Sequence, residues 1–267
     1  MASRLPSDLD PFLKSVVLPH GWRVAYAPSV TSTMDVAREA ARRGLTERLA
    51  FVTEYQSEGR GRRGRLWLAP PGKALLMSLL LPLGGEPLQL SQLVSVALCQ
   101  ALESQLGLEP QIKWPNDVLV HGRKVAGVLA EALTGPESGG EPDQRVSGYV
   151  IVGCGINVNL DPFDLKGLPE SAGSLQIAAG RPVHRGELLV VFLERLDGWL
   201  NRPAARRSVS IRGEWQRRLW HVSQPVRAED GGQEIEGIVE GCDPDGALLL
   251  RLENGELRRI VAGELIL

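Results

Sequence analysis

The sequence has few of the residues that build disulfide or metal frameworks. Among its 267 residues are four histidines and three cysteines, Cys99, Cys154 and Cys242. An odd number of widely spaced cysteines does not fit a disulfide framework and favours a reducing compartment. Since no two histidines have metal-ligand spacing, a structural zinc site is not expected. We therefore predict a cytoplasmic protein.

Long apolar runs and an excess of charge of either sign are also missing. The longest apolar stretches, such as residues 74–77 and 79–82, are far shorter than the roughly 20 residues that cross a bilayer. The first 22 residues carry acids and prolines where a signal peptide needs an apolar core. With 30 basic and 32 acidic residues, the net charge is −2. No global field would therefore draw the chain to nucleic acid or to a membrane.

The residues that are present indicate a globular protein, with 43% hydrophobic and 23% charged residues. Apolar patterns predict strands at residues 21–26, 49–55, 74–83, 111–113, 117–121, 124–131 and 145–153. Helices are predicted between residues 33 and 44, 90 and 102, and 188 and 200, and an exposed loop at 134–142. This mixture of elements favours an α+β (mixed α/β) fold.

The pattern changes after residue 203. Short strands are predicted at 225–227, 233–241, 247–252 and 257–261, separated by Gly-Gly, Pro-Asp-Gly and Asn-Gly turns. We therefore predict a main domain over residues 1–208 and a small β-barrel over 212–267. Because so small a unit is near the lower limit of independent stability, it should pack on the main domain.

The strongest local charge lies in the glycine-rich segment 56–73, where five cations face Glu58 alone. Glycines let the backbone approach a ligand, and arginines offer paired donors to phosphate or carboxylate. The spacing of Gly64, Gly72 and Lys73 does not match a Walker A loop. A solvated loop, a nucleic-acid contact and an anion site all remain open at this point.

Two further segments could carry chemistry. The Lys-Trp-Pro-Asn-Asp sequence of residues 113–117 offers Trp114 for stacking and Asn116 with Asp117 for hydroxyls or Mg²⁺, or else forms a packing corner. Lys124 lies at the mouth of an apolar strand in which Gly127 would let a ligand approach the sheet. The Gly153-x-Gly155 pair lacks the third glycine of a dinucleotide fingerprint.

Taken in order, these segments resemble the catalytic domain of biotin protein ligases. Residues 59–65, GRGRRGR, and the following Trp67 match the family's Gly-Arg-Gly-Arg-x-Gly-Arg loop. The Lys-Trp-Pro-Asn-Asp sequence, Lys124 with Gly127, and the Gly-x-Gly-Ile-Asn sequence of residues 153–157 reproduce the family's other motifs. The resemblance implies a central mixed sheet flanked by helices, similar to class II aminoacyl-tRNA synthetases, and a C-terminal SH3-like barrel.

The resemblance also implies an activity. Biotin and MgATP would give biotinyl-5′-AMP, and a lysine of the biotin carboxyl carrier protein domain would then attack this mixed anhydride. ATP and Mg²⁺ would be substrate and ion, with no tightly held organic cofactor. Because the biotin carboxylate is itself the nucleophile, catalysis would rest on alignment and on neutralising phosphate charge.

The family's site residues can be carried over to matching positions. Those implied for biotin are Ser32, Thr33, Gln56, Gly59, Arg60, Lys124 and Gly127. Those implied for ATP or the adenylate are Arg60, Arg62, Arg63, Arg65, Trp67, Lys113, Asn116, Asp117 and Asn157. Arg60 and Lys124 would be catalytic, and Asp117 would bind Mg²⁺.

The sequence departs from the family pattern at Met34, where the family's Ser-Thr-Asn has its asparagine. A polar contact there would be lost or moved to Asp35. About 20 residues precede the first core strand, too few for the helix-turn-helix domain of some bacterial members. We therefore expect a monofunctional ligase that does not bind DNA, as a monomer or homodimer.

Two alternatives remain. A lipoate ligase or octanoyl transferase has a similar fold, although the basic loop and the Lys-Trp-Pro-Asn-Asp sequence favour biotin. A nucleic-acid-binding module would use the basic loop, but it should interleave aromatic residues with the arginines, and only 5% of the chain is aromatic.

Overall fold

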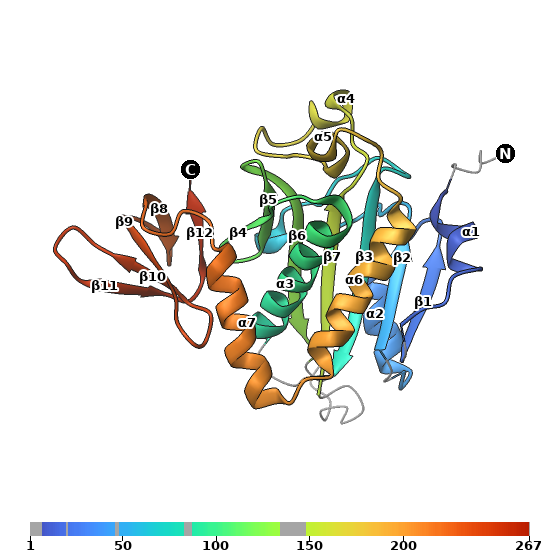
Figure 1. The fold of residues 1–267 in the computed structure, drawn as a ribbon, viewed down its shortest axis with the longest axis horizontal. Helices are drawn as coiled ribbons and strands as arrows, with labels where there is room; N and C mark the ends of the chain where they lie inside the picture. The colour runs from blue at the N-terminus through green and yellow to red at the C-terminus, as the bar shows by residue number, and fades with distance from the viewer. Residues whose placement is uncertain (1–6, 20, 46–47, 83–86, 134–147, 267) are drawn as a thin grey trace.

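The computed structural model describes residues 7–19, 21–45, 48–82, 87–133 and 148–266, which build two β-sheets with helices packed on the larger one (Figure 1). The larger sheet contains seven strands, β1 (Trp22–Ala27), β2 (Arg48–Thr53), β3 (Ala74–Pro82), β4 (Gln111–Lys113), β5 (Asp117–Val120), β6 (Arg123–Ala132) and β7 (Tyr149–Asn157). They follow the order β1-β2-β3-β7-β6-β5-β4. The β1–β2 pair is parallel and the others are antiparallel, which confirms the predicted mixed sheet.

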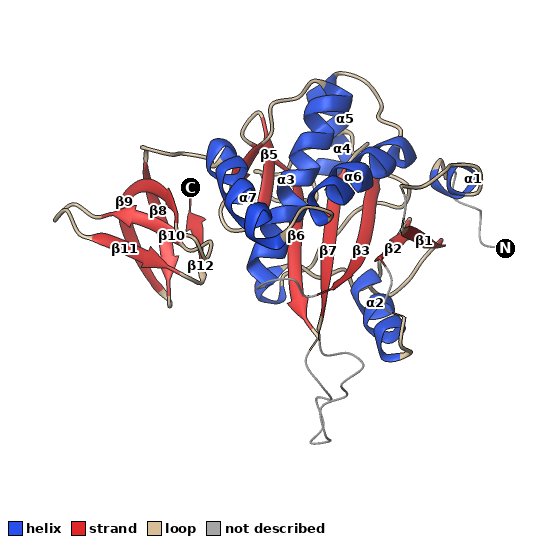
Figure 2. Ribbon diagram, turned by 60° about the horizontal axis from the view of Figure 1, so that its bottom comes forward, coloured by secondary structure: helices blue, strands red, loops and turns tan. Residues whose placement is uncertain are grey.

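Helices cover both faces of this sheet. On one face lie α3 (Pro87–Leu106) and α6 (Arg185–Leu200), and α2 (Thr33–Arg42) lies on the other (Figure 2). The remaining helices are α1 (Leu9–Leu13), α4 (Pro162–Leu165), α5 (Leu175–Ala179) and α7 (Ala204–Arg218). No helix in the described parts of the chain is long and apolar enough to cross a membrane.

The alternation of side chains along the central strands explains why the two faces differ. On β3, Leu75, Met77 and Leu79 are buried in the core formed with α3 and α6. A buried leucine contributes about 1.5–3 kcal/mol through the area it removes from water. The opposite face of β6 and β7 carries Gly127 and Gly155, so these strands contribute no side chains of their own at those positions.

Strand β7 continues further than the sequence predicted. The predicted strand ended at Gly153, and the Gly-x-Gly-Ile-Asn sequence was expected to follow it, but β7 extends to Asn157. Its backbone pairs with β3 on one side and β6 on the other, and these two ladders outweigh the low strand preference of glycine. The predicted loop at 134–142 and the start of the predicted strand at 145 lie outside the described residues.

The C-terminal unit is a five-stranded antiparallel sheet, which confirms the predicted small β-unit. Its strands are β8 (Pro225–Asp230), β9 (Gln233–Cys242), β10 (Leu248–Arg251), β11 (Leu257–Ile260) and β12 (Gly263–Ile266). Figure 1 shows this sheet beyond β4, at the opposite end of the molecule from β1. Trp114 fastens it to the main sheet by donating its indole N–H to the carbonyl of Gly246 at 3.0 Å.

Two elements near the C-terminus were missed from the sequence. Strand β12 pairs with β8, which is distant in the chain. Helix α7 crosses the residues at which the domain boundary was expected, and the boundary itself stays a prediction. This helix buries only one side, with Ile211 and Trp215 packed into the core, and its arginines hide the helical period.

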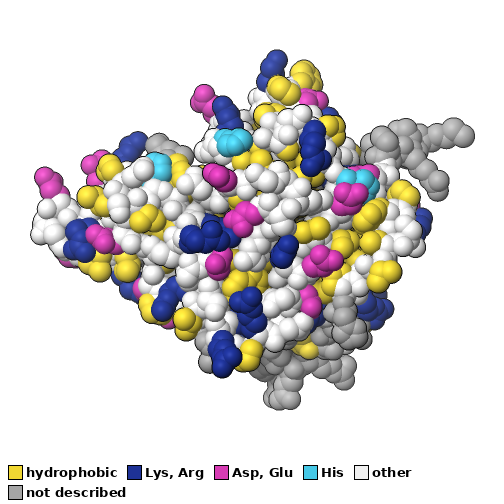
Figure 3. All heavy atoms as spheres, viewed as in Figure 1, with side chains coloured by type: hydrophobic (Ala, Val, Ile, Leu, Met, Phe, Trp, Pro, Cys, Tyr) yellow, Lys and Arg dark blue, Asp and Glu magenta, His cyan; other side chains and the backbone are white. Residues whose placement is uncertain are grey.

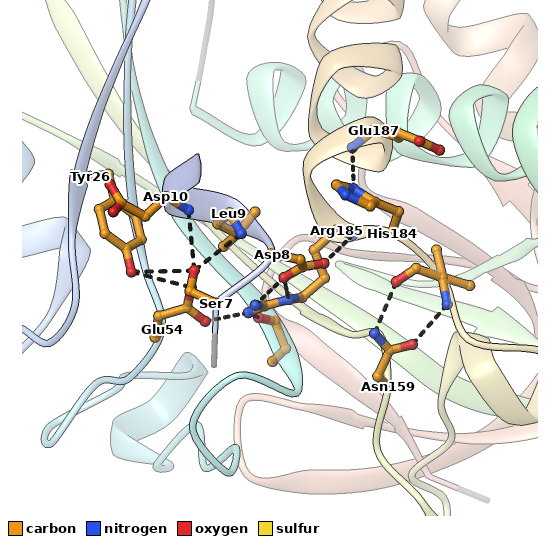
Figure 4. Close-up of polar contacts among 12 residues, drawn as sticks. Ser7, Asp8, Leu9, Asp10, Tyr26, Glu54, Asn159, His184, Arg185 and Glu187 are labelled. Carbon is orange, nitrogen blue, oxygen red and sulfur yellow. Dashed lines mark hydrogen bonds and ion pairs between the residues drawn. The ribbon is translucent and has the colours of Figure 1, made fainter. Parts of the chain in front are cut away.

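The N-terminal segment is fastened to the main sheet by a charged network (Figure 4). Arg185, at the start of α6, is 1% exposed and donates to the carboxylate of Glu54 at 2.5 Å and to the carbonyl of Ala74 at 3.1 Å. It also donates to Asp8 at 2.7 Å. Because Glu54 directly follows β2 and is two residues from Gln56, this network supports one wall of the cavity described below.

Charges of both signs are interspersed on the face of the molecule seen in Figure 3. Across the described residues many charged side chains form ion pairs, such as Arg48 with Asp197 and Lys73 with Asp161 and Asp164. This mixture agrees with the near-zero net charge and presents no broad cationic surface on that face.

Candidate functional site

A cavity of about 250 Å³ opens on the glycine-bearing face of the main sheet. Its walls come from the basic loop, the start of α2, the turn between β4 and β5, and the C-terminal strand β12. Most of the residues predicted for the site line it, namely Ser32, Thr33, Gln56, Arg60, Arg62, Arg65, Trp67, Lys113, Asn116, Asp117, Lys124, Gly127 and Asn157. Gly59 and Arg63 do not.

The floor of the cavity is a row of small residues across neighbouring strands. Asp117 on β5 pairs with Gly127 on β6, and Gly127 pairs with Gly155 on β7. The indole of Trp67 lies on this floor, and its buried Nε1 has no hydrogen-bond partner among the described residues. The glycines therefore let a flat ring rest directly against the sheet.

One end of the cavity is a hydrogen-bonding pocket at the start of α2. Ser32 caps the helix by accepting from the backbone N–H of Met34 at 3.3 Å. The Oε1 atom of Gln56 accepts from both the backbone N–H and the hydroxyl of Thr33, at 2.8 and 2.9 Å. The Thr33 hydroxyl also lies 2.7 Å from that of Ser78. Ser32, Thr33 and Gln56 are thus brought together, as the sequence predicted.

Met34 borders the cavity as an apolar side chain and takes no part in the hydrogen-bonding pocket through its thioether. Its side chain is 3% exposed and belongs to a cluster with Phe51, Leu80 and Ile151. Its Sδ atom would lie 2.8 Å from a Cβ atom at Gly153. The thioether therefore packs as an apolar group, and Asp35 forms ion pairs with Arg60 and Arg38 instead.

Lys124 and Asp117 form an ion pair beside the floor, with 2.7 Å between Nζ and Oδ1. The Lys124 ammonium also lies 5.5 Å from the centre of the Trp67 ring. Its side chain is 31% exposed, so a ligand in the cavity can reach it. This places a mobile cation where an anionic ligand on the floor would need one.

Arg60 lies at the other edge of the hydrogen-bonding pocket. Its two terminal nitrogens donate to the carboxylate of Asp35 at 2.9 and 2.6 Å. Burial by itself raises the pKa of Asp35, but hydrogen bonds and charge from Arg60 and Arg38 outweigh it and lower that pKa. Arg38 continues the chain of charges to Glu131 at 2.6 Å.

Within the described parts of the chain, two other cations line the cavity without a carboxylate contact of their own. Burial and the nearby charge of Arg63 lower the pKa of Arg62, which donates to the carbonyl of Gly263 at 3.2 Å. Burial lowers the pKa of Lys113, against the opposing charges of Asp117 and Glu264. Since both groups lose solvation as cations, an anionic ligand would stabilise them.

The two asparagines of the predicted site differ in whether their side chains can still form a hydrogen bond to a ligand. Asn116 donates its amide to the carbonyl of Val128 at 3.0 Å and so braces the β5–β6 pair. Asn157 donates to the carbonyl of Gly173 at 3.0 Å, but its buried Oδ1 has no partner among the described residues. That oxygen can accept a hydrogen bond from a ligand.

The interpretation of Trp114 as a stacking surface is not supported. Its side chain is 1% exposed and packs in the main core, with its N–H used by the carbonyl of Gly246. The alternative, a packing corner, fits this burial. Trp67, from the basic loop, is the aromatic group that lies on the glycine floor.

The basic loop was predicted to be irregular, and it contains one short turn, η1 (Arg62–Gly64). The backbone N–H of Trp67 donates to the carbonyl of Gly59 at 2.8 Å, which closes the loop. A Cβ atom at Gly59 would lie 2.4 Å from the carbonyl oxygen of Trp67, so glycine is required there. Gly59 therefore shapes the loop without lining the cavity.

The structure adds a residue that sequence reasoning missed. Glu264, on the last strand, lines the cavity and accepts from Arg65 at 2.8 and 2.6 Å. No motif surrounds Glu264, and the strand that carries it was not predicted. Its position opposite Glu229 on β8, which brings two acids together, is visible only in the folded structure.

No cluster of three or more histidine, cysteine or acidic side chains that could hold a metal ion occurs among the described residues. Among the described residues, the acidic side chains that line the cavity are Asp117, which pairs with Lys124, and Glu264, which pairs with Arg65. Such a site suits a hard cation that a phosphate ligand largely coordinates, since Mg²⁺ often uses one or two carboxylates and substrate phosphates.

Comparison with known proteins identifies relatives of both parts of the chain. Residues 26–157 match the biotin/lipoate A/B protein ligase family, and residues 222–267 match the biotin protein ligase C-terminal domain. The bifunctional ligase/repressor BirA of Bacillus subtilis is 32% identical over 262 residues, covering 95% of this chain and 76% of the relative. The biotin–[acetyl-CoA-carboxylase] ligase of Paracoccus denitrificans is 36% identical, covering 78% of this chain and 86% of the relative.

Solved structures agree with the sequence relatives. The biotin protein ligase from Aquifex aeolicus in complex with biotin and ATP superimposes with a TM-score of 0.75 at 28% identity. The match covers 91% of this chain and 97% of that protein. The likeness therefore extends over the main sheet and the C-terminal sheet together.

Proposed function

This chain belongs to the biotin protein ligase family, and from that premise we propose that it activates biotin with ATP and transfers it to a carrier protein. The observation that carries the proposal is the order of groups along one cavity. A hydrogen-bonding pocket at Thr33 and Gln56 is followed by the glycine floor, on which the Trp67 indole lies, and then by cations. This order suits a molecule with a polar ring at one end and a carboxylate at the other.

The pocket at the start of α2 would hold the ureido ring of biotin. Such a ring carries one carbonyl acceptor and two N–H donors, and the Ser32 and Thr33 hydroxyls with the Gln56 amide offer matching groups. These side chains are fixed by the helix cap and by their mutual hydrogen bonds before any ligand binds. Pre-fixed partners reduce the entropy cost of binding.

The first chemical step would join the biotin carboxylate to the α-phosphorus of ATP. A carboxylate oxygen forms the new P–O bond, the bond to the bridging oxygen of the β-phosphate breaks, and pyrophosphate leaves. Lys124 and Arg60 would align the carboxylate and α-phosphate, while Arg62 and Lys113 would neutralise the phosphates. No enzyme nucleophile is needed, so positioning and charge supply the catalysis.

The nucleotide would occupy the end of the cavity between the loop and β7. The free Oδ1 of Asn157 would accept a hydrogen bond from it, and the Trp67 indole would cover it. Asn116 would act through the backbone of β6, which it braces. Asp117 would hold Mg²⁺, which supplies charge neutralisation at phosphate oxygens when bound.

In the second step, the amine of a carrier lysine would attack the carbonyl of the mixed anhydride. The new amide bond replaces the bond to phosphate, AMP leaves, and the amine loses a proton. The expected acceptor is a biotin carboxyl carrier domain, in keeping with the acetyl-CoA-carboxylase ligase named among the relatives. A mixed anhydride is labile in water, so cover by the loop would protect it.

A nucleic-acid-binding role finds little support in the basic loop. Arg60, Arg63 and Arg65 each contact a carboxylate of the protein itself. These pairs leave the loop with much less free positive charge than its sequence suggested. Lipoate or octanoate remains the chemical alternative to test, because the matched family model also includes lipoate ligases.

The deciding experiment is titration calorimetry of the whole chain with biotin, lipoate and octanoate, each with and without MgATP. We expect biotin to bind alone and much more tightly with MgATP, as adenylate forms. Biotinyl-5′-AMP and pyrophosphate should then be detected in equal amounts by mass spectrometry and a phosphate assay.

Substitutions separate the ends of the cavity. Gln56→Ala should weaken biotin binding without MgATP, whereas Arg62→Gln should reduce only the tightening caused by MgATP. Preferential binding of lipoate or octanoate would identify a different acid as the substrate, while the proposed activation of a carboxylic acid would stand. Failure of all three acids to bind would contradict the proposal.

A further inference from the structure

Two glutamates of the C-terminal sheet lie directly opposite each other. Glu229 on β8 and Glu264 on β12 are partners in the antiparallel register. Directly opposed side chains project from the same face of the sheet, and like charges in this arrangement are destabilising. A cation between them removes that penalty.

The basic loop supplies one arginine to each glutamate. Arg63 contacts Glu229, with one of its two hydrogen bonds 2.8 Å long, and Arg65 contacts both carboxylate oxygens of Glu264 at 2.8 and 2.6 Å. Two arginines that are two positions apart in the loop therefore contact two glutamates that lie directly opposite each other in the sheet. Paired, two-pronged contacts of this kind fix direction as well as distance.

The loop backbone is shaped for this double contact. Arg63 has φ +57°, in the left-handed region that side-chain-bearing residues rarely occupy, and Gly64 follows with φ +72°. A residue persists in that region when its surroundings hold it there. In addition, Arg62 donates to the carbonyl of Gly263, so three arginines of the loop contact β8 and β12.

We propose that Glu229 and Glu264 are positioning residues that anchor the glycine-arginine loop on the C-terminal sheet. In this assignment Arg63 and Arg65 are the anchors of the loop, Arg60 pairs with Asp35 at the hydrogen-bonding pocket, and Arg62 is left for the ligand. The expected effect of this anchor on retention of biotinyl-5′-AMP rests on the proposed function. It gives the C-terminal sheet a defined part in the site, because the anchored segment leads directly to Trp67.

The hydrogen bonds from the arginines lower the pKa of both glutamates, so both stay charged at neutral pH. Arg63 does not line the cavity, and neither does Glu229, whereas Glu264 and Arg65 do. The Arg63–Glu229 pair can therefore be altered without changing a cavity wall. That separation allows anchoring to be tested apart from ligand contact.

The test reverses this pair, first on each side and then on both. Arg63→Glu and Glu229→Arg each place like charges together, and the double variant restores an opposite-charge pair. Two quantities are measured: hydrogen exchange of residues 59–67 without ligands, and the dissociation rate of biotinyl-5′-AMP. Each single variant should increase the hydrogen-exchange rate and the dissociation rate by about fivefold, because one exposed ion pair contributes free energy on that scale. The double variant should return both rates close to their original values.

The matched control reverses Arg251 and Glu240, an exposed pair on β10 and β9 with 2.6 Å between its atoms. It should change neither quantity. A second route avoids new repulsion: the double variant Glu229→Gln with Glu264→Gln removes the opposed charges. It should exchange faster in the loop while its melting temperature stays equal or rises.

The outcomes separate the two proposals. Unchanged exchange in the single variants would overturn the anchor. The anchor would also be overturned if adenylate dissociated faster in the single variants and the double variant did not return its rate to normal. A direct contact of Arg63 with phosphate predicts that result. Hydrogen exchange of the loop could also rise in the single variants and return to normal in the double variant while the protein never forms adenylate. That result would support the anchor and contradict the proposed function.

Discussion

The indole ring of Trp67 lies so close to Gly155 that a Cβ atom there would be 2.4 Å from ring atom Cε2. The neighbouring glycine of the floor, Gly127, is almost as close, with 3.0 Å from its Cβ position to ring atom Cζ3. The aromatic cover and the floor therefore share one space, and a side chain on the floor would displace the cover.

Gly155→Ala tests this relationship. The added methyl should push the Trp67 ring off the floor and speed dissociation of biotinyl-5′-AMP by about tenfold or more, at an overpacking cost of about 1–3 kcal/mol. Stopped-flow measurement of adenylate release and urea unfolding would record the two effects.

The matched control is Gly153→Ala, two residues away on the same strand. Its methyl would meet the Sδ atom of Met34 at 2.8 Å, and a thioether on a flexible side chain can move. We expect a cost of about 1 kcal/mol in unfolding free energy, at the low end of the overpacking range, and unchanged adenylate release. Equal behaviour of the two variants would show that Trp67 does not cover the ligand.

Lys124→Gln should slow adenylate formation while preserving the fold. Loss of a preorganised cation from a site of developing phosphate charge costs about 10²–10³-fold in rate. Biotin-dependent exchange of pyrophosphate into ATP measures this step directly. Lys73→Gln is the control, since Lys73 pairs with Asp161 and Asp164 outside the cavity and should change the rate less than twofold.

Arg185→Met should strongly destabilise the protein. It leaves Glu54, which is 1% exposed, without its buried cation, at a cost of about 3–5 kcal/mol in unfolding free energy. Urea denaturation would measure the loss. Adding Glu54→Gln should recover part of it, because the uncompensated charge is then removed.

An exposed pair provides the comparison for Arg185. Arg43→Met breaks the contact of Arg43 with Glu39, whose side chains are 74% and 52% exposed. The expected cost is about 0–1 kcal/mol. A similar small cost for Arg185→Met would mean that the N-terminal network contributes little to stability.

The cysteines should resist alkylation in the folded protein. Burial raises the pKa of Cys154 and Cys242 to about 12 and raises that of Cys99 further. Because the thiolate is the reactive form, iodoacetamide at pH 8 should modify these cysteines slowly, and faster as the pH rises. Mass spectrometry should show rapid modification only in denaturant, whereas fast native labelling of Cys154 would contradict its burial.

Much of the fold could be predicted because its signals are local. Apolar alternation located the central strands, and α2 (Thr33–Arg42) lies where a helix was predicted between residues 33 and 44. The extension of β7 to Asn157 and the β8–β12 pair could not be predicted in this way. Both depend on partner strands that are distant in the chain, so no local preference reveals them.

The site shows the same division. The order of motifs was enough to indicate the family, and most of the residues carried over from it line one cavity. The division of labour among the arginines was not visible, because Arg60, Arg62, Arg63 and Arg65 look equivalent along the loop. Their partners, Asp35, the carbonyl of Gly263, Glu229 and Glu264, come from three different elements.

The sequence by itself determined which chemical groups this protein carries and where most of the central strands and longer helices lie, since both depend on residue type and short-range spacing. Tertiary structure alone decided which cations are neutralised within the protein and which remain available in the cavity. Charge pairing depends on distance in space, and in this chain the decisive distances join the loop at residues 59–67 to a strand almost 200 residues further on.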